Sequence, residues 1–435
     1  MQKTDVIYKA YINILNEELV VAMGCTEPIA IAYAASKAKD ILGDKPDRVE
    51  IHVSNNIIKN VKSVVVPNTK GLKGIQAAAV AGIIAGNTEK KLEVISEVTD
   101  LQKDEMKDFL ENIAISVDAL DSNVIFDIIV ILYKGINYAK VRISQHHTNI
   151  VYVEKNGEIL YKSPLYDQME LGITSNTVEE GLSDKTLLNF KDILDFAETL
   201  DIVDIEEVIK RQIDYNTAIS EAGLKENYGA NIGSTLIKIY GNDIKNRAVA
   251  KAAAGSDARM SGCELPVVIN SGSGNQGITV SVPVIEYAYE IGVSKDKLYR
   301  ALVISNLISI HEKEGIGRLS AYCGAVTAGC AAACGIAYLY GGGYKELAHT
   351  LVNSVAIVSG IICDGAKPSC AAKIASSVES GILGYHMYMN GQQFRAGDGI
   401  VNKDVETTIK NVGRLGKDGM KETDKEIVKI MIDKC

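Results

Sequence analysis

The hydrophobic periodicity of the chain changes along its length, and this change limits the folds that it can adopt. Residues 48–165 contain short runs in which apolar and polar residues alternate, which is typical of half-buried β-strands. From residue 185 onward, apolar residues recur at a spacing near 3.6, which indicates amphipathic helices. The pattern predicts an α+β protein in which a small sheet domain is followed by a larger all-α domain.

We expect the sheet to be mixed or antiparallel. Strands are predicted over residues 48–53, 92–98, 113–117, 126–133, 138–144 and 148–153. The sequence Glu154-Lys-Asn-Gly-Glu158 is typical of the turn of a β-hairpin. An Ala-rich helix is predicted over residues 75–85.

The remaining segments predict helices. Residues 4–42 are expected to be helical, with a break at Met23-Gly-Cys-Thr-Glu-Pro28. Further helices are predicted over residues 187–200, 205–221, 236–254, 284–292 and 295–313, and around 322–340, 345–362 and 371–384. We therefore predict an N-terminal helical segment (1–45), an α+β domain (46–165), a polar linker (166–184) and an all-α domain (185–435).

Residues 319–344 contain no charged side chain and are long enough to cross a bilayer. The segment consists mostly of Ala, Gly, Cys, Ser and Thr, which pack closely against other helices and gain little from lipid. We predict a buried helix here.

Composition argues against several kinds of partner. The net charge is −9, whereas nucleic acid and anionic membranes attract clustered Lys and Arg. The first residues lack the apolar core of a signal peptide, so we expect a cytoplasmic protein. Its eight cysteines would then be reduced thiols, available for metal binding or catalysis.

Three of the cysteines lie in stretches rich in small residues. Cys323 is in Ser320-Ala-Tyr-Cys-Gly324, and Cys363-Asp-Gly-Ala-Lys-Pro-Ser-Cys370 contains the other two. Thiolates in such surroundings suit a soft metal or an iron–sulfur cluster. No C-x₂-C pair is present, however, and the spacing alone is more typical of buried free thiols. Cys330 and Cys334 fit that second interpretation best.

Cys25 stands in Gly24-Cys-Thr-Glu-Pro28, directly before a helical pattern. Thr26 can cap this helix and Pro28 suits its first turn. The backbone N–H groups of a helix N-terminus favour a thiolate, which would suit a base or a nucleophile. A packed thiol beside a cap is the equally good alternative.

Ser271-Gly-Ser-Gly-Asn-Gln-Gly277 matches the G-x-G-x-x-G pattern of dinucleotide-binding loops. The β-branched residues 278–282 and Pro283 argue against the helix of a βαβ unit, and no acidic residue stands where ribose binding needs one. A loop that binds a carboxylate through Ser271, Ser273 and Asn275 and a plain Gly-rich turn both remain open.

Two other loops carry polar groups. Pro67-Asn-Thr-Lys-Gly71 contains Asn68 and Thr69, and Gln145-His-His-Thr-Asn149 contains His147 and Thr148. Each could contact a substrate or be an ordinary loop. The same choice applies to Asp364, Lys367 and Lys373, which flank the cysteines and could stabilise thiolate charge.

Together these motifs resemble the L-cysteine desulfidase family, a relative of the iron–sulfur L-serine dehydratase alpha chain. The resemblance rests on Gly24-Cys-Thr-Glu-Pro28, on Ser271–Gly277, on Ser320-Ala-Tyr-Cys-Gly324 and on Cys363-Asp-Gly-Ala-Lys-Pro-Ser-Cys-Ala-Ala-Lys373. It runs in order from the first helices to about residue 400. The combination is specific, although no single motif is.

The resemblance implies an oxygen-sensitive [4Fe–4S] lyase that converts L-cysteine to pyruvate, hydrogen sulfide and ammonia without pyridoxal phosphate. Cys323, Cys363 and Cys370 would hold three irons in the all-α domain, and Cys25 would remove the α-proton. An alternative makes Cys25 a ligand in place of Cys370. Asn68, Thr69, His147, Thr148, Ser271, Ser273 and Asn275 would bind the substrate.

Other functions remain open at this point. L-serine dehydration needs the same base and the same cluster. A non-catalytic amino-acid-binding protein with structural thiols is the alternative from another class, and a nicotinamide enzyme is a more distant one. Cys435 could reach the open iron, as a C-terminal cysteine does in some serine dehydratases. The Ala- and Gly-rich helix surfaces would suit a homodimer.

Overall fold

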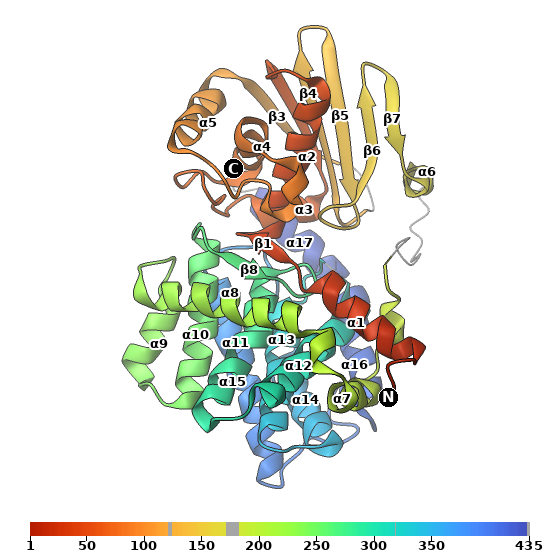
Figure 1. Ribbon diagram of the computed structural model, residues 1–435, viewed down its shortest axis with the longest axis vertical. Coiled ribbons are helices and arrows are strands. Elements are labelled where there is room, and N and C mark those ends of the chain that lie inside the picture. Colours follow the sequence, from red (N-terminus) through yellow and green to blue (C-terminus); the bar gives the residue numbers. More distant parts are fainter. Residues whose placement is uncertain (121–123, 171–181, 318, 433–435) are drawn as a thin grey trace.

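The computed structural model describes residues 1–120, 124–170, 182–317 and 319–432. Figure 1 shows a sheet with its helices at one end of the molecule and a larger group of helices at the other. We call them the sheet part (residues 26–170) and the helical part (residues 1–18 and 182–432). This arrangement confirms the predicted α+β class.

The sheet part contains a six-stranded sheet among the described residues, in the order β3-β2-β4-β5-β6-β7. β2 and β3 are parallel, and the other neighbouring strands are antiparallel, so the sheet is mixed, as predicted. The strands are β2 (Arg48–Val53), β3 (Ala114–Ala119), β4 (Asp127–Lys134), β5 (Asn137–Ser144), β6 (Ile150–Lys155) and β7 (Glu158–Lys162). Asn156 and Gly157 have positive φ in the β6–β7 turn, which explains the Asn-Gly signal.

Helices cover one side of this sheet. α2 packs against β4 and β5, and α4 packs against α2 (Figure 1). The helices of this part are α2 (Thr26–Leu42), α3 (Asn55–Val61), α4 (Gly74–Ala85), α5 (Asp100–Asn112) and α6 (Pro164–Glu170), with the 3₁₀ helix η1 (Thr88–Glu93). Alanines, valines and isoleucines from α2, α4 and the strands form one buried cluster.

The helical part is arranged around α13 (Gly324–Leu339), which contacts α11, α12, α14 and α15. Its other helices are α1 (Val6–Glu18), α7 (Phe190–Thr199), α8 (Glu206–Lys225), α9 (Ile232–Tyr240), α10 (Ile244–Met260), α11 (Gly274–Ile291), α12 (Lys295–Ile316), α14 (Tyr344–Val358), α15 (Cys370–Met389), α16 (Val405–Arg414) and α17 (Lys421–Ile432). Short turns η2 (Lys185–Leu187), η3 (Ile202–Asp204) and η4 (Leu415–Gly419) connect some of them.

Small residues let α13 and α15 approach each other closely. A Cβ on Gly329 would lie 2.7 Å from the carbonyl carbon of Ser377, and a Cβ on Gly381 would lie 2.5 Å from the Gly329 oxygen. The uncharged segment predicted from the sequence is therefore a buried helix whose small side chains serve helix packing. Within the described part of the chain, no helix is both long and apolar enough to cross a bilayer.

The two parts meet at a two-stranded antiparallel sheet. β1 (Val21–Met23) lies between α1 and α2, and it pairs with β8 (Pro266–Val268) of the helical part. α1 packs in the core of the helical part, whereas α2 packs on the sheet. The predicted N-terminal segment 1–45 thus divides between the two cores, and the predicted domain boundaries stay a prediction.

Three predicted elements are wrong. Residues 92–98 form the end of the 3₁₀ helix η1 and the turn after it instead of a strand. The helix predicted over 236–254 is two helices, because Gly241 at φ 85° separates α9 from α10. α11 continues through residues 278–282 and Pro283, because the β-branched residues are buried there and burial overrides their weak helix propensity. The predicted linker falls mostly on residues 171–181, outside the described residues.

Candidate functional site

A cavity of about 100 Å³ lies between the sheet part and the helical part. A buried water needs roughly 10–15 Å³, so the cavity can hold a group much larger than a single ion. Four cysteine side chains line it: Cys25, Cys323, Cys363 and Cys370. The sequence placed these thiols up to 345 residues apart, and the fold brings all of them to one place.

A short backbone bridge brings Cys323 and Cys363 together. Tyr322 and Ile362 form an antiparallel β-bridge. The Cys323 N–H donates to the Ile361 oxygen (3.1 Å), and the Cys363 N–H donates to the Ala321 oxygen (2.6 Å). The Cys323 thiol then donates a hydrogen bond to the Cys363 sulfur.

Cys370 reaches the cavity through a tight loop. Gly365 has a φ of 95° and its Cα lies against the backbone oxygen of Lys59, so a side chain at this position would collide with α3. Cys370 then begins α15, and its thiol lies 3.7 Å from the Gly365 oxygen. The small residues between Cys363 and Cys370 therefore serve a close approach between this loop and the sheet part.

Cys25 is the N-cap residue of α2, one position before the cap predicted from the sequence. Its thiol donates to Glu27 Oε2 at 3.2 Å, and Glu27 also lines the cavity. Burial and the Glu27 carboxylate raise the pKa of Cys25 well above its ordinary value, and Arg259 offsets this only in part. Burial and the Glu27 carboxylate thus oppose the effect of the helix N-terminus on the Cys25 thiol, and its role as a thiolate stays a prediction.

Helix N-termini surround the cavity. Cys25 precedes α2, Ser273 caps α11, Cys323 precedes α13 and Cys370 begins α15, and all four residues line the cavity. Each N-terminus carries a partial positive charge and free N–H groups. Their convergence favours negative charge in the cavity, such as thiolates or a carboxylate.

Positive side chains add to this field. The hydrogen bond from Cys323 lowers the pKa of Cys363, and the charges of Lys59 and Lys313 lower it further. The side chain of Lys59 is fully buried and forms an ion pair with Asp424 of α17. Lys373 and Lys367 pair with Asp364, so Asp364 joins both lysines to the cysteine loop. The three flanking residues named from the sequence thus form one group, in which both lysines pair with Asp364.

The three thiols of the helical part are candidate ligands for a cluster, because they line one cavity together. The hydrogen bond to Cys363 raises the pKa of Cys323, and burial and the charge of Cys363 raise it further. Burial raises the pKa of Cys370, and the charge of ionised Cys363 adds to this. All three can be thiolates only if a positively charged group lies among them. Among the described residues, no three His, Cys, Asp or Glu side chains have the spacing of a single-ion site. In a [4Fe–4S] cluster each thiolate binds a different iron, so the ligands stand further apart.

The residues predicted to bind substrate fall into two groups. His147, Ser271, Ser273 and Asn275 line the cavity. His147 lies in the β5–β6 loop and packs edge-on against Phe126, with ring centroids 4.8 Å apart. Ser271 and Gly272 have positive φ, and this turn directs the loop into α11. The Gly-rich sequence is thus a loop before a helix. The strand before it, β8, is part of a two-stranded antiparallel sheet and not of a βαβ unit.

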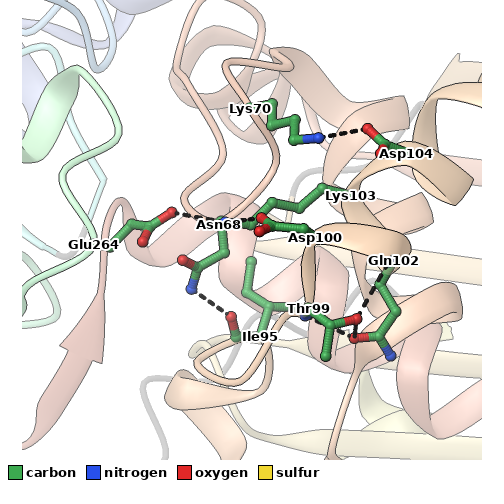
Figure 2. A network of polar contacts seen from close by, with 9 residues as sticks. All are labelled: Asn68, Lys70, Ile95, Thr99, Asp100, Gln102, Lys103, Asp104 and Glu264. Atoms are coloured by element: carbon green, nitrogen blue, oxygen red, sulfur yellow. Dashed lines mark hydrogen bonds and ion pairs between the residues drawn. The ribbon is translucent and has the colours of Figure 1, made fainter.

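Asn68, Thr69 and Thr148 do not line the cavity. The Asn68 amide donates to the Ile95 oxygen at 2.7 Å, and the Thr69 hydroxyl donates to the Val66 oxygen. Figure 2 shows Asn68 directed at Ile95, next to the ion pairs of Lys103 with Asp100 and Glu264. These contacts give Asn68 and Thr69 a structural role in the loop between α3 and α4.

Sequence reasoning missed several polar residues that line the cavity: Glu27, Asn60, Arg259, Gln276 and Lys313. Arg259 stands near the end of α10, among Ala, Gly and Ser residues that are buried. A charged residue in such a small, buried helix face is a signal that could have been found, because an isolated buried charge needs a partner. Cys330 and Cys334 lie in α13 and do not line the cavity, and Cys435 lies outside the described residues.

The comparisons with known proteins show the family of the chain. Residues 89–429 match the model of the serine dehydratase alpha chain family. Proteins named UPF0597 protein are similar over the whole chain. One from Desulfitobacterium hafniense (strain Y51) is 60% identical, with 100% of this chain and 99% of the relative covered. One from Lachnoclostridium phytofermentans is 50% identical, with 98% of this chain and 100% of the relative covered.

A UPF0597 protein of Treponema denticola is 46% identical, with 98% of each chain covered. Together with the family match, these similarities confirm the relationship to the iron–sulfur serine dehydratase alpha chain that the cysteine motifs indicated. The chain belongs to the serine dehydratase alpha chain family.

Proposed function

We propose that this protein is a [4Fe–4S]-dependent lyase that converts L-cysteine to pyruvate, hydrogen sulfide and ammonia by α,β-elimination. One observation carries the proposal: four cysteines from separate segments of the chain line a single cavity, together with a carboxylate beside Cys25. Cys323, Cys363 and Cys370 would hold the cluster, with Cys25 left as the base. Cys25 differs from the other three in its distance along the chain and in its hydrogen bond to Glu27.

When bound, the cluster supplies a Lewis acid that lowers the basicity of the leaving group on Cβ. The protein supplies the rest of the reaction. Elimination needs a base at Cα, and Cys25 is suited to this once its own proton has moved to Glu27 Oε2, 3.2 Å away. The α-proton then goes to the Cys25 sulfur, the Cβ–S bond breaks, and the sulfur leaves as hydrosulfide, which takes up the proton held on Glu27 to give hydrogen sulfide. The aminoacrylate released hydrolyses to pyruvate and ammonia.

The surrounding residues favour negative charge in this site. The helix N-termini of α2, α11, α13 and α15 favour the thiolates and the substrate carboxylate. Lys59 and Lys313 offset the negative charge on Cys363. His147, Ser271, Ser273 and Asn275 line the space that the amino acid would occupy.

L-serine dehydration is the second candidate, and the match to the serine dehydratase alpha chain favours it. The same base and cluster would serve, with hydroxide in place of hydrosulfide as the leaving group. The two substrates differ by one atom in one pocket, so a direct comparison is needed.

The test is an anaerobic purification, reconstitution with iron and sulfide, and an assay of pyruvate from L-cysteine and L-serine side by side. We expect pyruvate from L-cysteine, lost on exposure to air and absent in Cys363→Ala. Activity on L-serine alone would retain the mechanism and change the substrate. A protein that binds no cluster would overturn the proposal and leave the thiols as packing residues of a binding protein.

A further inference from the structure

Arg259 is a buried cation without a carboxylate partner. Its exposed fraction is 2%, and it forms no ion pair within the described residues. Nη1 donates to Asn275 Oδ1 at 3.1 Å, whereas Nε is buried without a hydrogen-bond partner among the described atoms. A buried charge that lacks a partner is strongly disfavoured, so such a group points to an anion that binds beside it.

The structure leaves room for the guanidinium at the cavity wall. Arg259 lines the cavity, and the first residue of α11, Gly274, lies directly against it. A Cβ on Gly274 would lie 2.8 Å from Arg259 Cζ. A second glycine on this wall, Gly324 of α13, makes room for Gln276 in the same way. A Cβ on Gly324 would lie 2.6 Å from Gln276 Oε1. The Gly-rich loop and the start of α13 therefore admit two polar side chains to the cavity.

The guanidinium shares the cavity with the two thiols at opposite ends of the proposed reaction. Arg259, the proposed base Cys25 and the proposed cluster ligand Cys370 all line it. A small molecule bound to it would lie near both.

We propose that Arg259 binds the α-carboxylate of the substrate and thereby holds Cα beside Cys25. The planar guanidinium matches a carboxylate in geometry, and Asn275 fixes its plane by accepting from Nη1. The amino acid is the ligand only insofar as the proposed function holds, but the anion site itself follows from the unpartnered cation.

The experiment compares Arg259→Gln and Arg259→Lys with the wild-type protein. Arg247→Gln is the matched control, because Arg247 lies on the same helix and is held in ion pairs with Glu286 and Glu290, outside the cavity. Three measurements are made. They are iron per chain after reconstitution, the kinetics with L-cysteine (KM and kcat), and the rise in Tm of the cluster-free protein with L-alanine. L-alanine carries the carboxylate and the ammonium group but no leaving group.

We expect Arg259→Gln to retain iron, to raise KM by about 10- to 100-fold with a smaller change in kcat, and to lose the L-alanine shift. Arg259→Lys should lie between this variant and the wild type, because it keeps the charge but not the planar fork. Arg247→Gln should keep KM and the shift. If Arg259→Gln does not fold, the comparison of Arg259→Lys with Arg247→Gln decides in the same way.

An unchanged KM and an unchanged L-alanine shift in the Arg259 variants would overturn the proposal. Loss of iron in both variants would also overturn it, since the guanidinium would then serve the thiolates. If the wild-type protein turns over neither amino acid, the proposed function fails, and the L-alanine shift alone decides about Arg259. A shift present in the wild type and lost in Arg259→Gln supports the anion site, and no shift in the wild type overturns it.

Discussion

Replacement of Gly274 by Ala tests the packing on which the polar wall of the cavity depends. The new methyl group would lie 2.7 Å from Val267 Cγ2 and 2.8 Å from Arg259 Cζ. Carbon atoms prefer about 3.5–4.0 Å, so both neighbours must move by about 1 Å. Val267 and Arg259 are buried, so neither can move into solvent. Overpacking of this kind costs about 1–3 kcal/mol, and the better helix propensity of Ala offsets less than about 1 kcal/mol.

We expect Gly274→Ala to lower the Tm by about 1–3 °C and to raise KM for the substrate, because the displaced guanidinium loses its alignment. Thermal denaturation of the cluster-free protein and steady-state kinetics of the reconstituted protein measure the two effects. Gly360→Ala is the control, because Gly360 has an ordinary φ and no atom within 4 Å of an added Cβ. If Gly274→Ala matched Gly360→Ala in both Tm and KM, the close contact between Gly274 and Arg259 would be refuted.

Three further outcomes follow from the contacts described above. Cys323→Ala should lose iron after reconstitution, whereas Cys330→Ala, which removes a thiol outside the cavity, should retain it; iron and sulfide analysis distinguishes them. Asn68→Ala should lower stability by about 1 kcal/mol through loss of the bond to Ile95 without changing KM, and an increased KM would show that Asn68 contacts substrate. Burial alone would raise the pKa of Glu406, but the hydrogen bond with His311 lowers this pKa below its ordinary value of 4.5. The pair therefore stabilises the fold above pH 4.5, and this contribution is lost as the pH falls. Tm measured from pH 3.5 to 7 should depend less on pH in Glu406→Gln.

The fold class was predictable because it rests on local patterns. Alternating residues such as those of β2 and β5 form strands on a half-buried sheet, and the Asn156-Gly157 turn needs positive φ that these residues tolerate. One failure occurred where tertiary burial outweighs propensity. α11 is helical through its β-branched residues and Pro283 because the whole segment is enclosed by neighbouring helices.

The candidate cysteines could be named from the sequence because thiols within Gly- and Ala-rich motifs are rare and chemically distinctive. Arg259 and Glu27 could not be assigned in the same way, because their role depends on what lies beside them. Burial, a property of the whole structure, also opposes the expected effect of the helix N-terminus on the pKa of Cys25.

The sequence by itself determined the chemistry that the chain can carry, through its thiols, its helix caps and its Gly-rich loops, since these depend on residue type and near neighbours. Only the tertiary structure decided which of them meet. The β1–β8 pairing, the Tyr322–Ile362 bridge and the close packing of Gly365 on α3 each join segments far apart in the chain. Their contacts bring the four thiols and the unpartnered guanidinium to one cavity, because packing and charge act through distance in space and not along the sequence.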